Sequence, residues 1–549
     1  MNAPLLPQTF FLEDAVALAR QSLLARLDPS LDYQPYFRLD LSGKRPQVRH
    51  ARWDYCDMAG RFVDALILTA PMIGLANPTD QEEGLRAFLL RRANRRDGLF
   101  YNGEAPWSTY QADMFCQGRV LLGLVSWFLL TGEATVQDRI EALIAGLSRV
   151  AVWDGDICWY PNDIWITDRW VAGGLWNGRA PGYWAQQTVG LARYAAATGS
   201  TSALRLATGL SRFFVYRSGV VGADGSFHGH THSQGILPRI LGALRTALIL
   251  GDPEIAAWAT RAYEHARRHT SAFGWIPDGL GLDSATTPYA GTCETCALSD
   301  LIELAITLTE AGFGDYWDDI ERFARNQLLE QQIRDVQRLF ADRSEQPVDE
   351  TVKSVAYGAF DSAARPNALL GDPHGVIEGC CTPAGARACF LVWDRTMTRR
   401  PGGIVVNLTF SRDAPWARLI SFEPYRGELR LEVREPAMFF LRLPSWVERS
   451  GVRLTTGGTE RPVSWHGQYL TLGMAQPGQS FGVTYPQRQA EFTDVLAGQA
   501  YVTRWKGNTV IQITPPGEHY PIYERTAYLA TEPPLSGRAV TAAPVAVTW

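Results

Sequence analysis

Residues 293–312 read CETCALSDLIELAITLTEAG, and this stretch decides the fold. Between Cys296 and Thr309, apolar residues fall on nearly every side of a helix, which predicts a helix that is buried on most sides. Gly312 follows, at the position where a residue of left-handed conformation commonly ends a helix. The next segment, 316–332, predicts an amphipathic outer helix. Its apolar side carries Ile320, Phe323, Ala324 and Leu328, with Asp319, Arg322 and Arg325 between them.

This pairing of a buried helix with an outer helix recurs along the chain. Apolar helices end at Gly74, Gly132, Gly199, Gly251 and Gly312, which lie 58, 67, 52 and 61 residues apart. A sixth apolar helix follows Thr382 and Pro383, which suit a helix cap and a first helical position. Six buried helices that alternate with outer ones predict an (α/α)6 barrel. An open helical solenoid is the alternative, and the lack of an obvious polar end-repeat favours the closed barrel.

The pattern changes after about residue 400. Strands are predicted at 404–410, 418–422, 428–433, 438–443, 469–472 and 481–485. Short strands at this spacing predict a β-sandwich, and residues 505–508 (WKGN) predict a hairpin turn in the tail. We therefore expect three parts: residues 1–50, which pack on the barrel or the sandwich, the barrel of residues 51–400, and the sandwich with its C-terminal tail, residues 401–549.

Composition narrows the class of function. The 549 residues are too many for one ordinary core, and a net charge of −5 gives no basic field for nucleic acid or anionic lipid. The N-terminus lacks a signal-peptide pattern and we see no run of about 18 apolar residues, so we expect a cytoplasmic protein without a membrane span. The 18 tryptophans slightly favour a carbohydrate partner. We expect a small glycoside or oligosaccharide as the partner, with no nucleic acid and no membrane, and a homodimer is left open.

Four of the eight cysteines form two clusters. Cys293 and Cys296 flank Glu294 at the start of the fifth buried helix, and Cys380 and Cys381 stand at the start of the sixth. The inner helices of such a barrel run parallel and consecutive ones are neighbours, so both clusters are expected at one mouth of the barrel. Thiolates and carboxylates bind zinc, and helix N-termini favour thiolates. Catalytic zinc is the leading prediction. A structural zinc site of four cysteines and metal-free buried cysteines are the alternatives.

These residues resemble a known family. Glu294-Thr295-Cys296 and Cys380-Cys381-Thr382-Pro383 are similar to the Glu-Thr-Cys and Cys-Cys-x-Pro motifs of glycoside hydrolase family 127 (GH127), the family of the β-L-arabinofuranosidases. Residues 440–446 (FLRLPSW) resemble that family's strand ending in Pro-x-Trp. The resemblance implies retaining hydrolysis at Zn²⁺. It also implies Glu294, Cys296 and Cys381 as ligands, and Cys380 as both ligand and nucleophile.

The match has departures. Cys293 stands where the family usually has another residue, so a shell of four thiolates stays open. The family's general acid is a glutamate upstream of the Glu-Thr-Cys motif, whereas this chain offers Asp278. Asp278 is therefore the predicted acid, because its apolar neighbours would raise its pKa. Asp283 and Glu378 are the alternatives.

Further candidates surround the predicted mouth. His230 and His232, which with His228 precede the fourth inner helix, are predicted to bind sugar hydroxyls; a second metal site or a solvated loop is the alternative. Trp184, Gln186 and Glu378 are the other candidate substrate contacts. Asp54 and Asp57 could also line the mouth, although for each of Asp54, Asp57, Trp184 and Gln186 taken singly a structural role is the simpler explanation.

Taken together, these features predict a zinc-dependent retaining glycosidase that releases a small, β-L-arabinofuranoside-like sugar. A glycosidase of another sugar specificity is the first alternative. A non-catalytic structural-zinc or carbohydrate-binding protein and a helical-barrel epimerase or lyase are the others. The pairing of a carboxylic acid with an activated thiolate favours hydrolysis.

Overall fold

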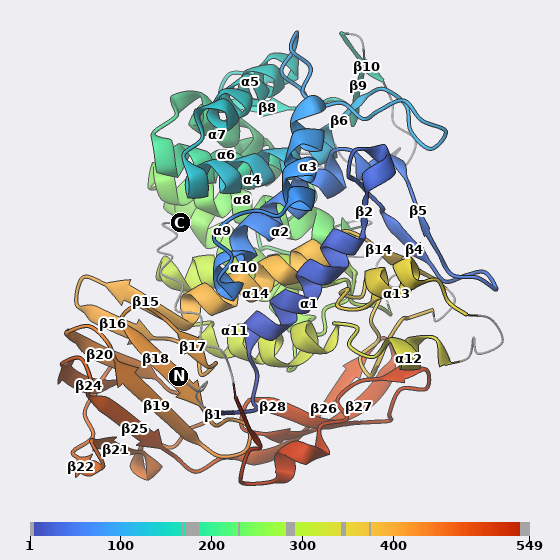
Figure 1. Cartoon of the computed structure of the whole chain (residues 1–549). Coiled ribbons are helices and arrows are strands. Elements are labelled where there is room, and N and C mark those ends of the chain that lie inside the picture. Colours follow the sequence, from blue (N-terminus) through green and yellow to red (C-terminus); the bar gives the residue numbers. More distant parts are fainter. Residues whose placement is uncertain are drawn as a thin grey trace.

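The computed structural model describes residues 5–166, 168–171, 186–228, 231–280, 291–341, 347–372 and 375–537. Figure 1 shows a helical barrel with two β regions packed beside it. Six inner helices form the barrel: α2 (Asp57–Thr69), α4 (Met114–Thr131), α6 (Gln187–Thr198), α8 (Ser233–Leu250), α10 (Thr295–Glu310) and α14 (Cys381–Thr396). Each packs against the next in chain order, and α14 packs against α2. The ring is therefore closed, which confirms the predicted (α/α)6 barrel and excludes the open solenoid.

The recurrent glycines end the inner helices as predicted. Gly132, Gly199 and Gly251 directly follow α4, α6 and α8. Gly312 follows α10 after one intervening residue, Ala311. Gly74 ends the 3₁₀ turn Pro71–Ile73 after α2. All five have φ between 67° and 81°, a backbone conformation that glycine adopts without steric cost. The repeat seen in the sequence therefore marks the points where the chain turns back toward the outer layer.

One outer helix packs beside each inner helix. In chain order these are α1 (Leu12–Ala25), α3 (Asp80–Arg91), α5 (Ala134–Val150), α7 (Thr201–Tyr216), α9 (Pro253–Arg268) and α11 (Trp317–Phe323), which continues as a π-helical turn, Ala324–Leu328. The outer partner of α14 is α1, so the N-terminal segment supplies the sixth outer helix.

The fifth outer helix departs from the amphipathic prediction. Asp319 and Arg325, expected on its polar side, are both buried. Arg325 Nη2 donates to Glu321 Oε1 at 2.9 Å and to Thr409 Oγ1 at 3.0 Å. Arg325 therefore lies in the interface with the residues after 400, whereas Asp319 pairs with Arg267 of the outer helix α9 at 2.6 Å.

The inner helix α4 corrects the expectation that no segment is apolar enough to span a membrane. Among the described residues, α4 is the one helix that is long and apolar enough to cross a membrane. However, 72% of this stretch is buried inside the protein. An inner barrel helix is surrounded by other helices, so it is apolar on all sides for that reason.

The β-sandwich follows α14. One sheet has the order β15 (Met397–Arg400), β16 (Gly403–Val406), β20 (Ala437–Arg442), β24 (Tyr469–Ala475), β23 (Trp465–His466). The other has the order β17 (Arg412–Asp413), β18 (Ala417–Ser421), β19 (Glu428–Val433), β25 (Ser480–Thr484), β21 (Arg453–Thr456), β22 (Thr459–Arg461). A separate hydrophobic core, which includes Ile404, Leu431 and Phe481, draws on both sheets. This arrangement confirms the predicted sandwich.

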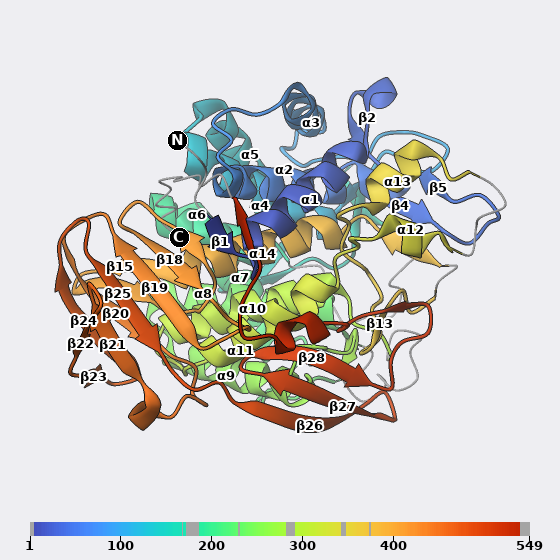
Figure 2. The same cartoon turned by 60° about the horizontal axis from the view of Figure 1, so that its bottom comes forward.

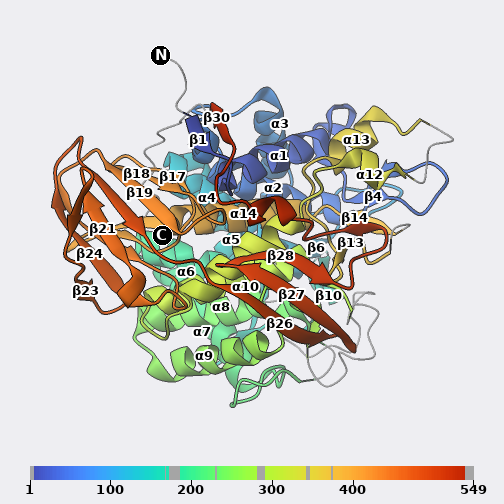
Figure 3. The same cartoon turned by 90° about the horizontal axis from the view of Figure 1, so that it is seen from below.

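The tail forms a third β unit. Strands β26 (Gln489–Leu496), β27 (Gln499–Lys506) and β28 (Thr509–Thr514) make an antiparallel sheet, and Gly507, at φ 60°, lies in the predicted turn between β27 and β28. Trp505 and Ile513 of this sheet belong to the barrel's hydrophobic core, not to the sandwich core. Figures 2 and 3 show the sheet lying along the barrel.

The sandwich and the starts of the inner helices lie at opposite ends of the barrel. The chain leaves α14 at Thr396 and enters β15 at once, whereas β14 (Val376–Glu378) leads into the start of α14. Figure 1 shows β14, β4 (Arg38–Asp40) and β5 (Gln47–Arg49) on the side away from the sandwich. The end of the barrel at which the inner helices begin, here called the mouth, is therefore not covered by the sandwich.

Candidate metal centre and active site

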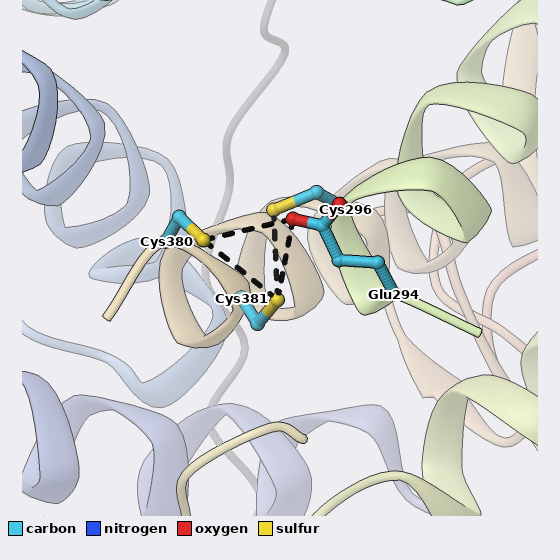
Figure 4. A group of neighbouring side chains, drawn as sticks. All are labelled: Glu294, Cys296, Cys380 and Cys381. Carbon is cyan, nitrogen blue, oxygen red and sulfur yellow. Dashed lines mark hydrogen bonds between the residues drawn. The ribbon is translucent and has the colours of Figure 1, made fainter. Parts of the chain in front are cut away.

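Two neighbouring helix starts bring the predicted ligands together. Glu294 is the residue that precedes α10 and Cys296 is the second residue of that helix. Cys380 precedes α14 and Cys381 begins it. Because α10 and α14 pack side by side, the four side chains converge, as Figure 4 shows. All four are buried.

The spacing of the four donor atoms suits a tetrahedral metal. Cys381 Sγ lies 3.7 Å from Cys296 Sγ, 3.9 Å from Cys380 Sγ and 3.7 Å from Glu294 Oε1, and Cys380 Sγ lies 3.6 Å from Glu294 Oε1. All the donor atoms of this group lie within 4.8 Å of one another. Zinc bonds of about 2.0–2.3 Å in a regular tetrahedron place the donors about 3.3–3.8 Å apart. The donor types, and the four separations of 3.6 to 3.9 Å, are therefore compatible with a tetrahedral metal ion such as zinc.

Cys293 lies outside this group. The backbone at Glu294 is extended, so consecutive side chains point in opposite directions. The Cys293 thiol is buried behind the cluster, 4.0 Å from the Glu294 carbonyl oxygen. The geometry thus gathers one carboxylate and three thiols, and not the four thiols of the structural-site alternative.

The expected cap of the sixth inner helix is wrong in detail. The helix begins two residues earlier than predicted, so Cys380 takes the capping position and Pro383 is the third helical residue. Proline is tolerated there because the first N–H groups of a helix have no partner within it. Thr382 Oγ1 instead accepts a hydrogen bond from the Phe360 N–H at 3.2 Å. The shift places both cysteines at the unpaired N–H groups of the helix start, which favour thiolates.

The N-terminal segment fixes the position of Cys380. Strand β4 pairs antiparallel with β14, and the Gly379 N–H donates to the Phe37 carbonyl at 2.6 Å. A Cβ atom at Gly379 would lie 2.9 Å from that carbonyl oxygen and 3.2 Å from Met58 Sδ. Glycine is therefore required where the chain passes between the strand and the first inner helix.

A second group of donors adjoins the cluster. His232 Nε2 lies 2.8 Å from Glu294 Oε2 and 3.0 Å from Asp278 Oδ1. The short pair β11 (Thr231–His232) and β12 (Gly279–Leu280) brings His232 beside Asp278, across 46 residues of sequence. Glu294 thus faces the thiols with one oxygen and His232 with the other. His232, Asp278 and Glu294 together have ligand spacing too, so the geometry leaves room for a second ion.

The carboxyl groups around the cluster differ in acidity. Burial raises the pKa of Asp278 to about 6, although the neighbouring His232 acts in the opposite direction. Burial, together with negative charge at Cys380 and Glu294, raises the pKa of Glu378 to about 8. Burial would also raise the pKa of Glu294, but the hydrogen bond and charge of His232, together with Cys296 and the charge of Arg61, outweigh it and lower that pKa to about 2. The mouth therefore holds carboxyl groups in different protonation states, as acid–base chemistry requires.

The remaining candidates divide into four cases. Glu378 reaches the cluster, with Oε2 3.9 Å from Cys380 Sγ. Gln186 is buried at the start of α6, where its Nε2 donates to the Gln234 carbonyl at 3.5 Å. His228 is exposed and bonds Ser226 Oγ at 2.8 Å, which fits a loop role. His230, Trp184 and Asp283 lie outside the described residues.

Asp54 and Asp57 have structural partners. Asp54 accepts hydrogen bonds from Gln34 Nε2 and from the N–H groups of Phe37 and Ala51, each at 3.0 Å, and pairs with His50 Nδ1 at 2.7 Å. Asp57 pairs with Arg61, whose guanidinium in turn faces Cys296. Arg61 was missed in the sequence, although a charged residue within the apolar helix α2 was a visible signal.

Solved structures with a similar fold include enzymes of the family that the sequence motifs resemble. A GH127 β-L-arabinofuranosidase from Geobacillus stearothermophilus T6 superposes with a TM-score of 0.61 at 15% identity, over 91% of this chain and 80% of that one. The chain has the fold of the GH127 enzymes. A second GH127 β-arabinofuranosidase gives 0.61 at 14% identity, over 90% of this chain and 78% of the other. The fold expected from the family resemblance is therefore confirmed.

A likeness over a smaller part of the chain extends to another class of enzyme. A sugar epimerase from a ruminal bacterium gives a TM-score of 0.50 at 11% identity, over 69% of this chain and 98% of its own. No family model and no curated protein matches the sequence. One fold can serve different reactions, so the reaction has to be inferred from the side chains at the mouth.

Proposed function

We propose that the protein is a zinc-thiolate retaining glycoside hydrolase with a cysteine nucleophile, acting on a small, β-L-arabinofuranoside-like glycoside or oligosaccharide. The observation that carries the proposal is the convergence of Glu294, Cys296, Cys380 and Cys381 at the mouth of a GH127-like barrel, with donor spacings of 3.6 to 3.9 Å. The sugar-epimerase likeness covers 69% of this chain, whereas the GH127 likeness covers 91%, which favours the hydrolase over an epimerase.

The four side chains would hold the metal. Thiolates and a buried carboxylate are donors that zinc accepts. When bound there, zinc would keep the thiols deprotonated at neutral pH and stabilise the cysteine sulfur when it leaves the sugar. Every other task falls to the chain's own side chains.

Cys380 is the proposed nucleophile. Its sulfur would attack the anomeric carbon and displace the leaving oxygen, giving a thioglycoside at Cys380 with inverted configuration. Water would then attack the same carbon from the opposite face and release the cysteine sulfur. Two inversions give net retention. The helix start at Cys380 supports this role, because its N–H groups favour the thiolate.

Asp278 is the proposed general acid, and then the base for water. Its pKa of about 6, raised by burial, leaves it partly protonated near neutral pH. The alternative, Glu378, lies only 3.9 Å from Cys380 Sγ. Retaining glycosidases hold acid and nucleophile about 5–5.5 Å apart, so that the glycosidic bond fits between them. Glu378 is therefore better suited to accept hydrogen bonds from sugar hydroxyls next to the nucleophile.

His232 would orient both carboxylates and present its ring edge to the sugar. Its side chain is 22% exposed, so it reaches the open side of the site. His230, Trp184, Gln186 and Glu378 are the further proposed sugar contacts. A cytoplasmic location is part of the proposal, supported by all eight cysteines being free thiols.

A screen of aryl glycosides tests the function. Zinc-loaded, reduced protein is assayed with furanosides and pyranosides of common sugars, and the anomeric configuration of the first product is followed by NMR. Retained configuration on an arabinofuranoside supports the full proposal. Retained configuration on another sugar supports the proposed mechanism but not the proposed substrate. Inverted configuration, or the absence of any hydrolysis, contradicts the proposal.

A further inference from the structure

The four candidate ligands concentrate negative charge inside the barrel. Ligands must be deprotonated to bind a metal, so one carboxylate and three thiolates bring four negative charges to an ion with two positive ones. All four ligands are buried, and an uncompensated buried charge is costly. The surrounding side chains therefore have to supply positive charge.

Arg61 faces one of the thiols. Its Nη1 lies 3.7 Å from Cys296 Sγ, within hydrogen-bond distance of sulfur, and its Nε donates to Asp57 Oδ1 at 2.9 Å. In the orientation of the Gln234 amide that satisfies its hydrogen bonds, the amide oxygen accepts from Arg61 Nη2 at 3.1 Å. Asp57 and Gln234 thus fix the guanidinium so that its remaining N–H points at the thiol.

The other ligands also have cationic neighbours. Arg26 is fully buried, and its Nη1 donates to the carbonyl oxygens of Tyr36 and Phe37, both at 3.2 Å. Burial lowers the pKa of Arg26 to about 10, while negative charge at Cys380 and Cys381 acts in the opposite direction. His232 bonds the carboxylate of Glu294. Arg61 and His232 therefore contact members of the ligand set directly, and Arg26 adds buried positive charge that acts on Cys380 and Cys381.

Arg61 lies where a sugar cannot reach it. It lines a space of about 20 Å³ on the inner side of Cys296, together with Arg119 and Asp300. Such a space holds about one water molecule. The Arg61 side chain is 7% exposed. Among the proposed ligands, Cys296 is the one that Arg61 contacts, so we expect Arg61 to act on the metal centre through this thiol.

We propose that Arg61 is a positioning residue of the metal centre, whose hydrogen bond to Cys296 Sγ offsets the excess negative charge and sets how tightly the cluster holds its ion. The inference rests on the proposed zinc site, but not on the sugar or on turnover. An N–H bond to a thiolate draws electron density from the sulfur, so Cys296 donates less to the metal. The metal then keeps more of its charge for the remaining ligands, Cys380 among them.

The test compares full-length Arg61→Met, which keeps the side-chain volume but loses the charge and the donor, with the wild type. Zinc affinity is measured by competition with a chromophoric chelator. The absorption spectrum is recorded after cobalt(II) replaces zinc, because its thiolate-to-metal band reports electron donation from sulfur. Without Arg61 the excess negative charge of the buried ligands is no longer offset, and we expect this effect to exceed the gain in sulfur donation. The expected result is a 10- to 100-fold loss of zinc affinity, which is typical when a partner of a metal ligand is removed. The cobalt band should move to lower energy, because the unbonded sulfur is the better donor.

Arg245→Met is the matched control. Arg245 is an inner-helix arginine that bonds Glu303 at 2.9 Å instead of a thiol, so its loss should lower stability without moving the cobalt band. If Arg61→Met does not fold, Arg61→Gln is used instead, since it keeps a polar donor but has no charge. We again expect lower zinc affinity and a cobalt band at lower energy. Unchanged zinc affinity and an unchanged band in the folded Arg61 variant overturn the inference. Wild-type protein that binds neither zinc nor cobalt overturns the proposed metal site itself, and zinc binding without hydrolysis contradicts only the proposed activity.

Discussion

His232 Nε2 lies 2.8 Å from Glu294 Oε2, so one imidazole connects a metal-ligand candidate to the acid candidate Asp278, 3.0 Å away. The carboxylate of Glu294 therefore serves two neighbours at once, the thiols on one side and the histidine on the other. Glu294 and Asp278 therefore share one histidine while they face different neighbours. Because His232, Asp278 and Glu294 also have ligand spacing, the number of metal ions per chain tests whether Asp278 is free to act as the acid.

Reduced, freshly purified protein should contain one zinc ion per chain. Cys296→Ser and Cys381→Ser should lose it, because each removes a thiolate from a tetrahedral shell, whereas Cys293→Ser should keep it, because Cys293 lies outside the group. Metal analysis by mass spectrometry gives the stoichiometry, and X-ray absorption should show sulfur at about 2.3 Å. Two ions per chain would mean that Asp278 is a ligand and not the acid.

Cys380→Ser should abolish turnover, with a loss of several orders of magnitude, because the nucleophile is removed. Zinc content must be measured in the same sample, since the variant also removes a proposed ligand. Cys389→Ser, a buried position further along α14, is the matched control and should retain activity. A zinc-loaded Cys380→Ser enzyme with wild-type rates would rule out this nucleophile.

Asp278→Asn should affect substrates according to their leaving group. A poor leaving group needs the proton, so we expect a loss of about 10²–10⁴-fold in kcat/KM on an alkyl glycoside and a much smaller loss on an activated aryl glycoside. Glu378→Gln is the comparison, and it should raise KM similarly for both substrates. Equal losses on both substrates in Asp278→Asn would transfer the role to Glu378 or Asp283.

Asp113 should make stability depend on pH. It caps α4 and is buried, and burial raises its pKa to about 7, although Arg52 lowers it in part. The folded state therefore keeps a proton that the unfolded chain has already released, so this group costs stability as pH rises from about 4 to about 7, by about 1.4 kcal/mol per pH unit at most.

Asp113→Asn should remove that dependence, because asparagine caps equally well and carries no charge. The stabilising effect of the substitution should grow between pH 4 and 7 and then level off, as measured by thermal unfolding. Asp252→Asn, at the partly exposed cap of α9, controls for the amide itself. A stability difference that is the same at pH 5 and pH 8 would contradict the expectation.

The sequence by itself determined the architecture. The recurrent glycines fix where inner helices end, since a left-handed residue closes a helix wherever it occurs, and apolar residues on all sides of 296–309 can only be buried. The pairing of Glu294-Thr295-Cys296 with Cys380-Cys381 at consecutive helix starts likewise needs only the barrel topology. These features depend on local backbone conformation and on burial. Both can be predicted from the positions of glycines and apolar residues in the sequence.

Tertiary structure decided what depends on orientation. Whether Cys293 or Glu294 joins the three other thiols follows from the extended backbone before α10, and the start of α14 at Cys381 follows from strand β14 pairing with β4. Arg61, which contacts the Cys296 thiol, comes from a helix 235 residues away in the sequence. Such contacts arise from packing between distant segments, and no local pattern records which side chain a buried charge will meet.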